Sequence, residues 1–370
     1  TIDIALEVGK MNIYETRQIR NVVVLGHGGC GKTTMVEAMA YVTGVTNRMG
    51  KVSDGNTISD FDKEETKRLF SIGTSVVPIE WEGIKINLLD TPGYFDFVGE
   101  VEEALSAADA AIIVINGKSG IEVGTQKAWD FCEKYDLPRM FFVTNMDDDH
   151  ASFREVVVKL SEMYGRRIAP FHIPIRENEK FVGFVNVVKM KGRRFIGNTS
   201  DYEECEIPDY SEKYLTISRE SLIEAVAETS EEYMERYFAG EEFTYEEVSS
   251  ALREHVLDGQ IVPVLMGSGL YAQGPKMLLM AIEKYFPSPD MCSIYGNDTS
   301  NGEMVMLNYD CTKHVSAKVF KTIVDPFIGK YSLIKVVTGV LKAGDTIYNI
   351  NKDSERSEER RVGKECRSRW

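Results

Sequence analysis

The chain has 370 residues, of which 43% are hydrophobic, and its 58 acidic and 43 basic side chains give a formal net charge of −15. This length predicts two or three domains, each able to bury a core, and a charged fraction of 27% excludes wholesale disorder. Taken alone, the negative total argues against a nucleic-acid partner.

Other features of the composition exclude further classes of protein. No apolar run approaches the roughly 18 residues that a membrane span requires. The first ten residues carry no cleavage signal, and the six cysteines are scattered without a CxxC pair, which is typical of reduced thiols rather than of disulfides or a zinc site. We therefore expect a cytoplasmic protein that does not enter a membrane. We also expect it to be a monomer.

The chain is predicted to begin with a lead segment over residues 1–19, in which residues 1–10 show no pattern. Met11 opens a plausible start, so one hypothesis is that residues 1–10 are non-native. From residue 20 to residue 144, predicted strands and helices then alternate, which is typical of an α/β fold with a mostly parallel, doubly wound sheet. The predicted strands span 22–25, 76–81, 84–89, 111–115 and 140–143.

Residues 151–260 mix predicted helices and strands, and we interpret them as an α+β subdomain inserted in a domain that spans 20–289. The stretch 201–260 holds 18 acidic and 4 basic residues. Leu222, Val226 and Tyr233 lie on an apolar helical face, whereas acidic side chains fill the other face. One segment therefore accounts for most of the negative charge of the chain.

The pattern changes after a strand at 261–266 and a helix that ends near Tyr285. We predict a linker over residues 290–314. Strand-like segments separated by glycines then predict the start of a β-barrel domain over residues 315–355.

The last fifteen residues, 356–370, carry 6 basic and 3 acidic side chains. Their letters are similar to the translation of a common sequencing adapter, so we interpret this tail as an artefact. A solvated basic arm is the alternative.

The strongest motif lies between the first predicted strand and the helix that follows it. Its letters GHGGCGKT fit the phosphate-binding pattern GxxxxGK[ST], in which backbone N–H groups wrap the phosphates. Lys32 would reach the β- and γ-phosphates, and Thr33 would ligate Mg²⁺. The GTP-binding residues predicted here are Gly26, His27, Gly28, Gly29, Cys30, Gly31, Lys32, Thr33 and Thr34.

A second motif, Asp90-Thr91-Pro92-Gly93, follows the predicted strand at 84–89. Asp90 at such a strand end can hold Mg²⁺ through water, and Gly93 lets its N–H approach the γ-phosphate. Alone this tetrapeptide is an ordinary turn, but after a phosphate-binding loop it indicates a nucleotide site.

Two further loops follow predicted strands and are candidates for reading the base. In the first, Asp147 would accept hydrogen bonds from guanine N1–H and N2–H₂, which adenine cannot supply in that geometry. The second is a glycine-rich tripeptide that could complete the base pocket. The predicted contacts are Thr144, Asn145, Met146 and Asp147 together with Gly267, Ser268 and Gly269.

These motifs, in this order, resemble the elongation factor G family of bacterial translational GTPases over about residues 20–351. The similar segments include GHGGCGKTT at 26–34, DTPGYFDFVGEV at 90–101, FVTNMD at 142–147 and PVLMGSG at 263–269. The resemblance implies a P-loop GTPase domain that binds GTP or GDP with Mg²⁺, then a barrel and three further domains. It implies a GTP-hydrolysing factor that acts on the ribosome and moves tRNA and mRNA, of which this chain would be an N-terminal part.

The resemblance assigns a role to Ser71 and exposes a departure at Asn145. The family's switch-I run Arg-Gly-Ile-Thr-Ile maps onto residues 68–72, which places Ser71 where a Mg²⁺-binding threonine is expected. A solvated loop serine is the alternative. Asn145 stands where the family has a lysine that lies along the base.

The departure with the largest consequence is Tyr94, which follows Gly93 where the family has a histidine placed against the attacking water. A phenol can orient water, but with an ordinary pKa of about 10 it cannot take a proton at neutral pH as imidazole can. The resemblance therefore implies slow or altered hydrolysis in a divergent paralogue, with Tyr94 as the candidate catalytic residue beside Lys32. Alternatively, Tyr94 and Phe95 pack a hydrophobic patch.

Other functions stay open on the sequence. One is a ribosome-associated module whose GTP occupancy sets its conformation with little hydrolysis, and another is a ribosomal protection GTPase of the tetracycline-resistance type. An ATPase is least favoured because Asp147 sits where guanine is read. In the family the insert faces the ribosomal stalk protein, so the acidic stretch 201–260 is either a docking surface or a solvated face, and a negative total does not exclude the ribosome.

Overall fold

The computed structural model describes residues 12–298, 301–325, 329–342, 344–352 and 354–357. The chain divides into two compact units, of which one is Gln18–Ser288 and the other combines Thr1–Arg17 with Pro289–Trp370. Residues 1–10, and all but the first two residues of the tail 356–370, lie outside the described residues, so both hypotheses about these ends stay predictions.

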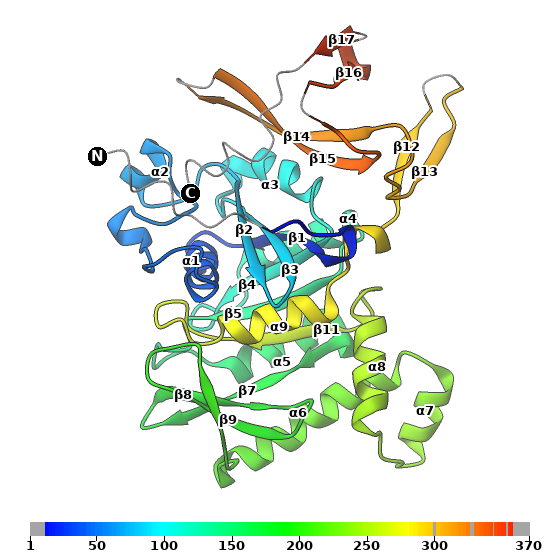
Figure 1. The fold of residues 1–370 in the computed structure, drawn as a ribbon. Helices are drawn as coiled ribbons and strands as arrows, with labels where there is room; N and C mark the ends of the chain where they lie inside the picture. Colours follow the sequence, from blue (N-terminus) through cyan, green and yellow to red (C-terminus); the bar gives the residue numbers. More distant parts are fainter. Residues whose placement is uncertain (1–11, 299–300, 326–328, 343, 353, 358–370) are drawn as a thin grey trace. The chain divides into compact units, whose positions relative to one another are not determined.

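The unit Gln18–Ser288 is built on a seven-stranded sheet with the order β2-β3-β1-β4-β5-β11-β6 (Figure 1). Neighbouring strands from β3 to β6 pair in parallel, and β2 forms an antiparallel hairpin with β3. The strands are β1 (Ile19–Gly26), β2 (Ser75–Trp81), β3 (Ile84–Asp90), β4 (Ala110–Asn116), β5 (Arg139–Thr144), β6 (Ile168–Pro170) and β11 (Val262–Met266).

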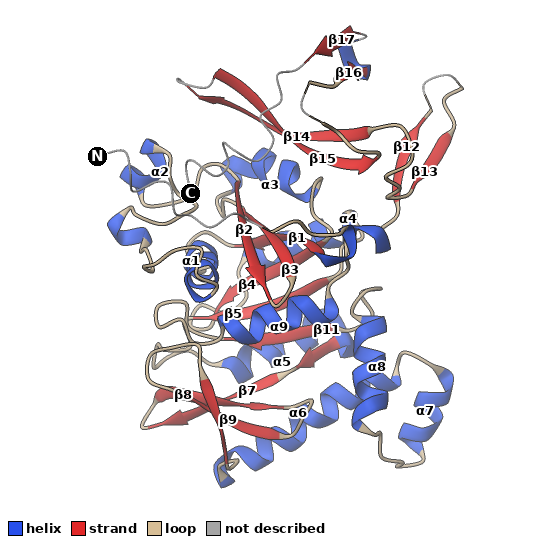
Figure 2. Cartoon of the chain, viewed as in Figure 1, coloured by secondary structure: helices blue, strands red, loops and turns tan. Residues whose placement is uncertain are grey.

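Helices cover both faces of this sheet (Figure 2). Helices α1 and α9 pack together on one face, and α3, α4 and α5 lie on the other. Their bounds are α1 (Lys32–Val42), α2 (Lys63–Arg68), α3 (Val98–Leu105), α4 (Val123–Lys134), α5 (Phe153–Tyr164) and α9 (Pro275–Tyr285). The predicted α/β class with a mostly parallel, doubly wound sheet is therefore confirmed.

The central strands are apolar because the helices bury them on both sides. All seven residues of β4 except Asn116 are buried, as are all six residues of β5. Between α4 and α5, the ring of Trp129 stacks on Tyr164 at 3.8 Å and on Phe141 at 5.9 Å between centroids. This stack joins the two helices to the middle of the sheet.

The inserted part is shorter than residues 151–260. Helix α5 packs on β6, and β6 pairs in parallel with β11, so both belong to the main sheet rather than to the insert. The sequence does not reveal this because a three-residue edge strand has too few positions to show a period. The inserted elements begin with β7 at His172.

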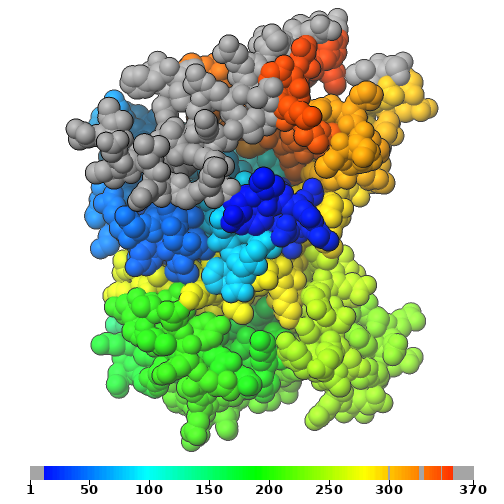
Figure 3. Space-filling view, viewed as in Figure 1, coloured from blue at the N-terminus to red at the C-terminus, as the bar shows by residue number. Residues whose placement is uncertain are grey.

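The insert consists of a four-stranded antiparallel sheet followed by helices, and it is drawn in green in Figure 3. The sheet has the order β10-β9-β8-β7. Acidic side chains lie in the first turns of all three helices. The elements are β7 (His172–Glu177), β8 (Lys180–Asn186), β9 (Lys191–Phe195), β10 (Tyr202–Cys205), α6 (Asp209–Ala227), α7 (Glu231–Phe238) and α8 (Tyr245–His255).

The second unit contains three antiparallel strand pairs among its described residues. The segment 290–314, predicted as a linker, instead holds a hairpin, because the apolar run in β13 pairs with β12 and Gly302 supplies a turn at φ 76°. Residues of the predicted barrel start also form antiparallel pairs, without a closed barrel among the described residues. The strands are β12 (Ile294–Asn297), β13 (Met304–Leu307), β14 (Ser316–Asp325), β15 (Gly329–Thr338), β16 (Thr346–Asn349) and β17 (Ser354–Ser357).

Within the part of the chain that the structure describes, no helix combines the length and the apolar character needed to cross a membrane.

The aromatic stack predicts a large effect of Trp129→Ala on stability. Trp129 is 7% exposed, so its removal leaves a cavity, and we expect the free energy of unfolding to fall by about 3–5 kcal/mol. Chemical denaturation followed by far-UV circular dichroism measures this. The matched control is Phe238→Ala, whose ring is 78% exposed and whose loss should change stability by less than about 0.5 kcal/mol. Equal effects of the two substitutions would contradict the packing argument.

Candidate functional site

The site lies at the carboxyl ends of the parallel strands, and its first part is the loop that joins β1 to α1. Gly26 has φ 143° and Gly31 has φ 97°, values that only glycine adopts without strain. A side chain at Gly26 would also meet Val114 O and Cys30 Sγ. The loop therefore keeps the tight turn that a phosphate-binding backbone requires.

Lys32 is the first residue of α1 and is 5% exposed. Its ammonium donates to Gly26 O at 3.0 Å and to His27 O at 2.9 Å. The side chain is thus folded under the loop, where its positive charge faces the place that phosphate oxygens would occupy.

The three predicted Mg²⁺ ligands come together. Thr33 Oγ1 donates to Asp90 Oδ2 at 2.9 Å and lies 3.1 Å from Ser71 Oγ. The other oxygen, Asp90 Oδ1, is buried and has no hydrogen-bond partner within the described ranges of the chain. Hydroxyl and carboxylate oxygens are the ligands that Mg²⁺ prefers, so this donor set fits the ion.

Two further residues of the same cluster, Ser59 and Asp60, are not predicted by the sequence. Ser59 Oγ donates to Asp90 Oδ2 at 2.7 Å, and Asp60 lies close enough to Asp90 and Ser71 for both to affect the pKa of its carboxyl. Both precede the matched switch-I run, and a Ser-Asp pair carries no signal of its own. The mapping that placed Ser71 was the one signal that pointed to this segment.

The electrostatics of the cluster suit a cation. Burial raises the pKa of Asp90, although the hydrogen bond from Ser59 and the positive charge of Lys32 both act to lower it. Burial and the neighbouring Asp90 raise the pKa of Asp60 to about 7. Two buried carboxyl groups this close hold their charges at a cost, which a divalent cation between them would offset.

The base-reading loop is tied directly to the phosphate-binding loop. Thr144 Oγ1 donates to Cys30 O at 2.6 Å and to Ile115 O at 3.2 Å. Asn145 follows in the left-handed region, at φ 56°. Asp147 Oδ1 is then a buried oxygen without a hydrogen-bond partner among the described residues, as expected of a group kept for the N–H donors of a base.

The second base loop contacts both the first base loop and the start of α1. Gly267 O accepts from Met146 N at 3.2 Å, and Ser268 is completely buried. A side chain at Gly269 would lie 2.9 Å from Thr34 Cγ2. The two base loops and the phosphate-binding loop thus form one continuous wall.

His27 and Cys30 occupy the phosphate-binding loop as spacers. His27 Nε2 lies 3.7 Å from Glu122 Oε1, beside the start of α4. Cys30 is 1% exposed, and burial raises the pKa of its thiol. Their backbones contribute to the loop, and neither side chain is placed for nucleophilic chemistry.

Comparison with known proteins agrees with this geometry. The model of the elongation factor Tu GTP binding domain matches residues 17–288, which is most of the chain. The chain belongs to this family of translational GTPases.

The relatives of this translational GTPase include elongation factors G. That of Thermotoga petrophila is 36% identical over 337 residues, which are 90% of this chain and 48% of the relative. That of Thermotoga maritima is also 36% identical, over 90% of this chain and 49% of the relative. A crystal structure of a Thermus thermophilus protein is 35% identical, with a TM-score of 0.77 over 89% of this chain and 47% of that one. The chain spans about half the length of the curated relatives it matches.

The switch-II loop of this GTPase domain begins at Asp90 and presses on the phosphate-binding loop. Thr91 Oγ1 donates to Val24 O at 2.6 Å, and Pro92 follows. A side chain at Gly93 would lie 2.7 Å from Gly28 N and would also meet Lys32 Nζ. Only glycine allows this close approach between the two loops.

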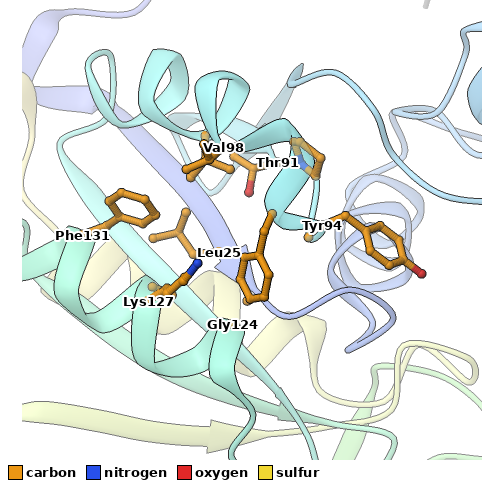
Figure 4. Close-up of a pocket in the computed structure, with 13 residues that line it drawn as sticks. Leu25, Thr91, Tyr94, Val98, Gly124, Lys127 and Phe131 are labelled. Carbon is orange, nitrogen blue, oxygen red and sulfur yellow. The ribbon is translucent and has the colours of Figure 1, made fainter.

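Tyr94 lies over the phosphate-binding loop. Its ring would be 3.2 Å from a side chain at Gly28, and it meets Phe70 edge to face at 4.9 Å between centroids. Figure 4 shows the ring turned away from Lys127 and Phe131, which line the pocket between switch II and α4. Phe95 takes that side, with Lys127 Nζ 3.8 Å from its ring centre. Tyr94 and Phe95 both line this pocket, but their rings have different neighbours, Phe70 for Tyr94 and Lys127 for Phe95.

The free oxygen of Asp147 predicts the effect of Asp147→Asn. An amide presents N–H to the guanine N–H groups instead of accepting from them, so we expect GDP affinity to fall about 100-fold, on the scale of a lost charged hydrogen bond. Xanthosine diphosphate should bind the variant better than GDP, because xanthine presents a carbonyl at C2. Titration with fluorescent nucleotides measures both.

The control for this experiment is Asp130→Asn, which changes the same charge at an exposed position of α4, outside this loop. It should leave GDP affinity within about threefold, as expected of a surface substitution. Equal losses in the two variants would show that charge, and not base recognition, accounts for the effect.

Proposed function

We propose that this chain is the nucleotide-binding part of an elongation-factor-G-like translational GTPase, which hydrolyses GTP to GDP and phosphate on the ribosome and promotes movement of tRNA and mRNA. The observation that carries the proposal is Asp147 Oδ1, buried and without a partner among the described residues, in a loop bonded to the phosphate-binding loop. A guanine base supplies the adjacent N–H donors that this oxygen lacks.

The residues of the chain divide the chemistry between them. Lys32 and the backbone N–H groups of the phosphate-binding loop would hold the phosphates, and Thr33, Ser71 and Asp90 would hold Mg²⁺, with Asp90 acting through water. The metal supplies charge neutralisation at the phosphate oxygens when bound. Phosphoryl transfer depends mostly on such positioning and electrostatics, so the chain retains the principal parts of the machinery.

Tyr94 sets the expected rate. It occupies switch II directly after Gly93 and is 47% exposed, so its hydroxyl can meet water at the edge of the phosphate-binding loop. A phenol orients water by hydrogen bonding but does not remove its proton at neutral pH. We therefore propose slow hydrolysis that depends on the ribosome.

Tyr94 also supports a second candidate function, a ribosome-associated GTP-binding module with little hydrolysis. In such a module the contact of Tyr94 with Phe70 would hold switch I and switch II together while nucleotide is bound. Brisk hydrolysis of GTP in the presence of ribosomes would exclude this candidate.

The proposed partners are the ribosome and, through the acidic insert, its stalk protein. The first turns of α7 and α8 each carry two glutamates, and this part of the chain supplies most of the negative charge. A negative surface suits a basic protein segment better than RNA. We propose that the protein acts as a monomer and in the cytoplasm, and its scattered cysteines agree with that compartment.

The comparison of Tyr94→His with Tyr94→Phe tests the role of this residue. Imidazole can accept a proton near neutral pH, so we expect Tyr94→His to raise the ribosome-stimulated rate of GTP hydrolysis about 10- to 100-fold. Tyr94→Phe should lower the rate, because the hydroxyl that orients water is gone. Phosphate release with ribosomes and saturating GTP measures the rates.

Nucleotide competition accompanies this experiment, because ATP should not displace bound GDP. If Tyr94→His gives no gain and Tyr94→Phe is unchanged, the side chain only packs, and the proposed role is wrong. Displacement of GDP by equimolar ATP would contradict the guanine-specific function itself.

A further inference from the structure

Arg176 of the inserted sheet reaches out of the insert to the loop that carries Asp147. Its Nη2 donates to three carbonyl oxygens of that loop, Met146 O at 2.7 Å, Asp148 O at 3.2 Å and Ala151 O at 3.1 Å. These carbonyls flank Asp147 on both sides. One guanidinium thus forms hydrogen bonds along the backbone of the base-reading turn, before and after Asp147.

A local irregularity in the pairing of β7 with β8 lies beside Arg176, where β8 carries one extra residue, Val182. The pairing of β7 with β8 shifts register between Ile175 and Arg176, which marks a β-bulge. The remaining contacts fix the residue in place, since Nη1 donates to Glu179 O at 2.7 Å and Tyr210 donates to Arg176 O at 2.8 Å. Arg176 is therefore anchored within the insert and extended towards the GTPase domain.

The charge of the turn adds to the effect of these bonds. Three aspartates follow one another in this turn, Asp147, Asp148 and Asp149. Burial lowers the pKa of Arg176, and the negative charges of these aspartates act to raise it. The guanidinium is half-buried, where hydrogen bonds from a charged donor are stronger than at the surface. It both satisfies the carbonyls and offsets the repulsion between the three carboxylates.

The insert holds the second base loop as well, through the turn between β9 and β10. Gln273 Nε2 donates to Gly197 O at 3.1 Å. At the start of α9, Lys276 N donates to Ser200 Oγ at 3.0 Å, and the ammonium of Lys276 pairs with Asp201. The two sheets are also joined directly, where Phe171 N donates to Val264 O at 3.0 Å and β7 contacts β11 (Figure 1).

We infer that the inserted sheet is the support of the guanine pocket, and that Arg176 is the positioning residue that holds Asp147 for the base. This inference rests on the proposed guanine-nucleotide function. Arg176 touches only protein groups and acts through the loop, so the insert sets how well the pocket distinguishes guanine and how long it retains the nucleotide.

The test compares Arg176→Ala with Arg219→Ala in the full chain. Arg219 is a matched control because it is also a half-buried arginine of the insert that donates to two backbone carbonyls, Val187 O at 3.2 Å and Val188 O at 3.3 Å. Those carbonyls lie within the insert. Arg176→Ala removes bonds to four backbone carbonyls and Arg219→Ala removes bonds to two, and only Arg176→Ala releases the base-reading turn.

The readouts are affinity and dissociation rate for mant-labelled GDP, and the ratio of the affinities for GDP and inosine diphosphate, which lacks the 2-amino group. We expect Arg176→Ala to weaken GDP binding about tenfold, mainly through faster dissociation. The ratio of GDP to inosine diphosphate affinity should fall several-fold, because an Asp147 that is no longer held in place accepts a weaker hydrogen bond from the 2-amino group. Arg176→Lys, which keeps the charge, should recover part of both losses.

Arg219→Ala should also lower the melting temperature, while leaving both nucleotide readouts unchanged. The inference is overturned if Arg176→Ala keeps the wild-type ratio, or if Arg219→Ala alters it equally. If Arg176→Ala does not fold, the test rests on Arg176→Lys. A wild-type ratio of GDP to inosine diphosphate affinity in that variant then counts against the inference. Failure of the wild-type chain to bind GDP at all would instead refute the proposed function.

Discussion

The position of one buried carboxylate, Asp90, determines how the loops of the candidate nucleotide site meet. It lies at the end of β3 with 1% exposure and accepts hydrogen bonds from Thr33 of α1 and from Ser59 of the segment before α2. Burial raises its pKa, while these hydroxyls and the charge of Lys32 favour the ionised form. Switch I, switch II and the phosphate-binding loop therefore meet at one carboxylate, and the place for a cation follows from that meeting.

The sequence predicted those parts of the site whose chemistry depends on fixed spacing. The loop around Lys32 was recognisable because a few glycines at set positions are required to wrap phosphate. Ser59 and Asp60 were not, because their place depends on the path of switch I. That path is fixed by two buried glutamates, Glu37, which accepts from Gly50 N and Ile58 N at 2.7 Å, and Glu65, which accepts from Ile72 N at 2.9 Å. Contacts of this kind leave no periodic trace in a sequence.

Tyr94, the departure from the family pattern with the largest consequence, fits its neighbours in space. The ring of Tyr94 would lie only 3.2 Å from a side chain at position 28, and Gly28 avoids that close contact. On its other side the ring meets Phe70, the residue before the candidate ligand Ser71. A large aromatic group after Gly93 is thus accommodated by a missing side chain in one loop and a matching ring in another. This arrangement argues that Tyr94 belongs to a consistent site and is not an isolated loss of histidine.

The net charge gives little information about how the insert acts. The stretch 201–260 makes the chain acidic, and yet the insert contact that matters most for the base pocket is a cation, Arg176, set against three consecutive aspartates. The attraction between these groups acts over a few ångströms, whereas the total of −15 describes only the field at a distance. The β9–β10 turn bonds to the segment after the other base loop, so the insert contacts the base pocket at two places, through this turn and through Arg176. The acidic helices and the residue that we propose positions Asp147 therefore belong to the same insert, so the proposed partner contact and the proposed support of the base pocket would be made by one part of the chain.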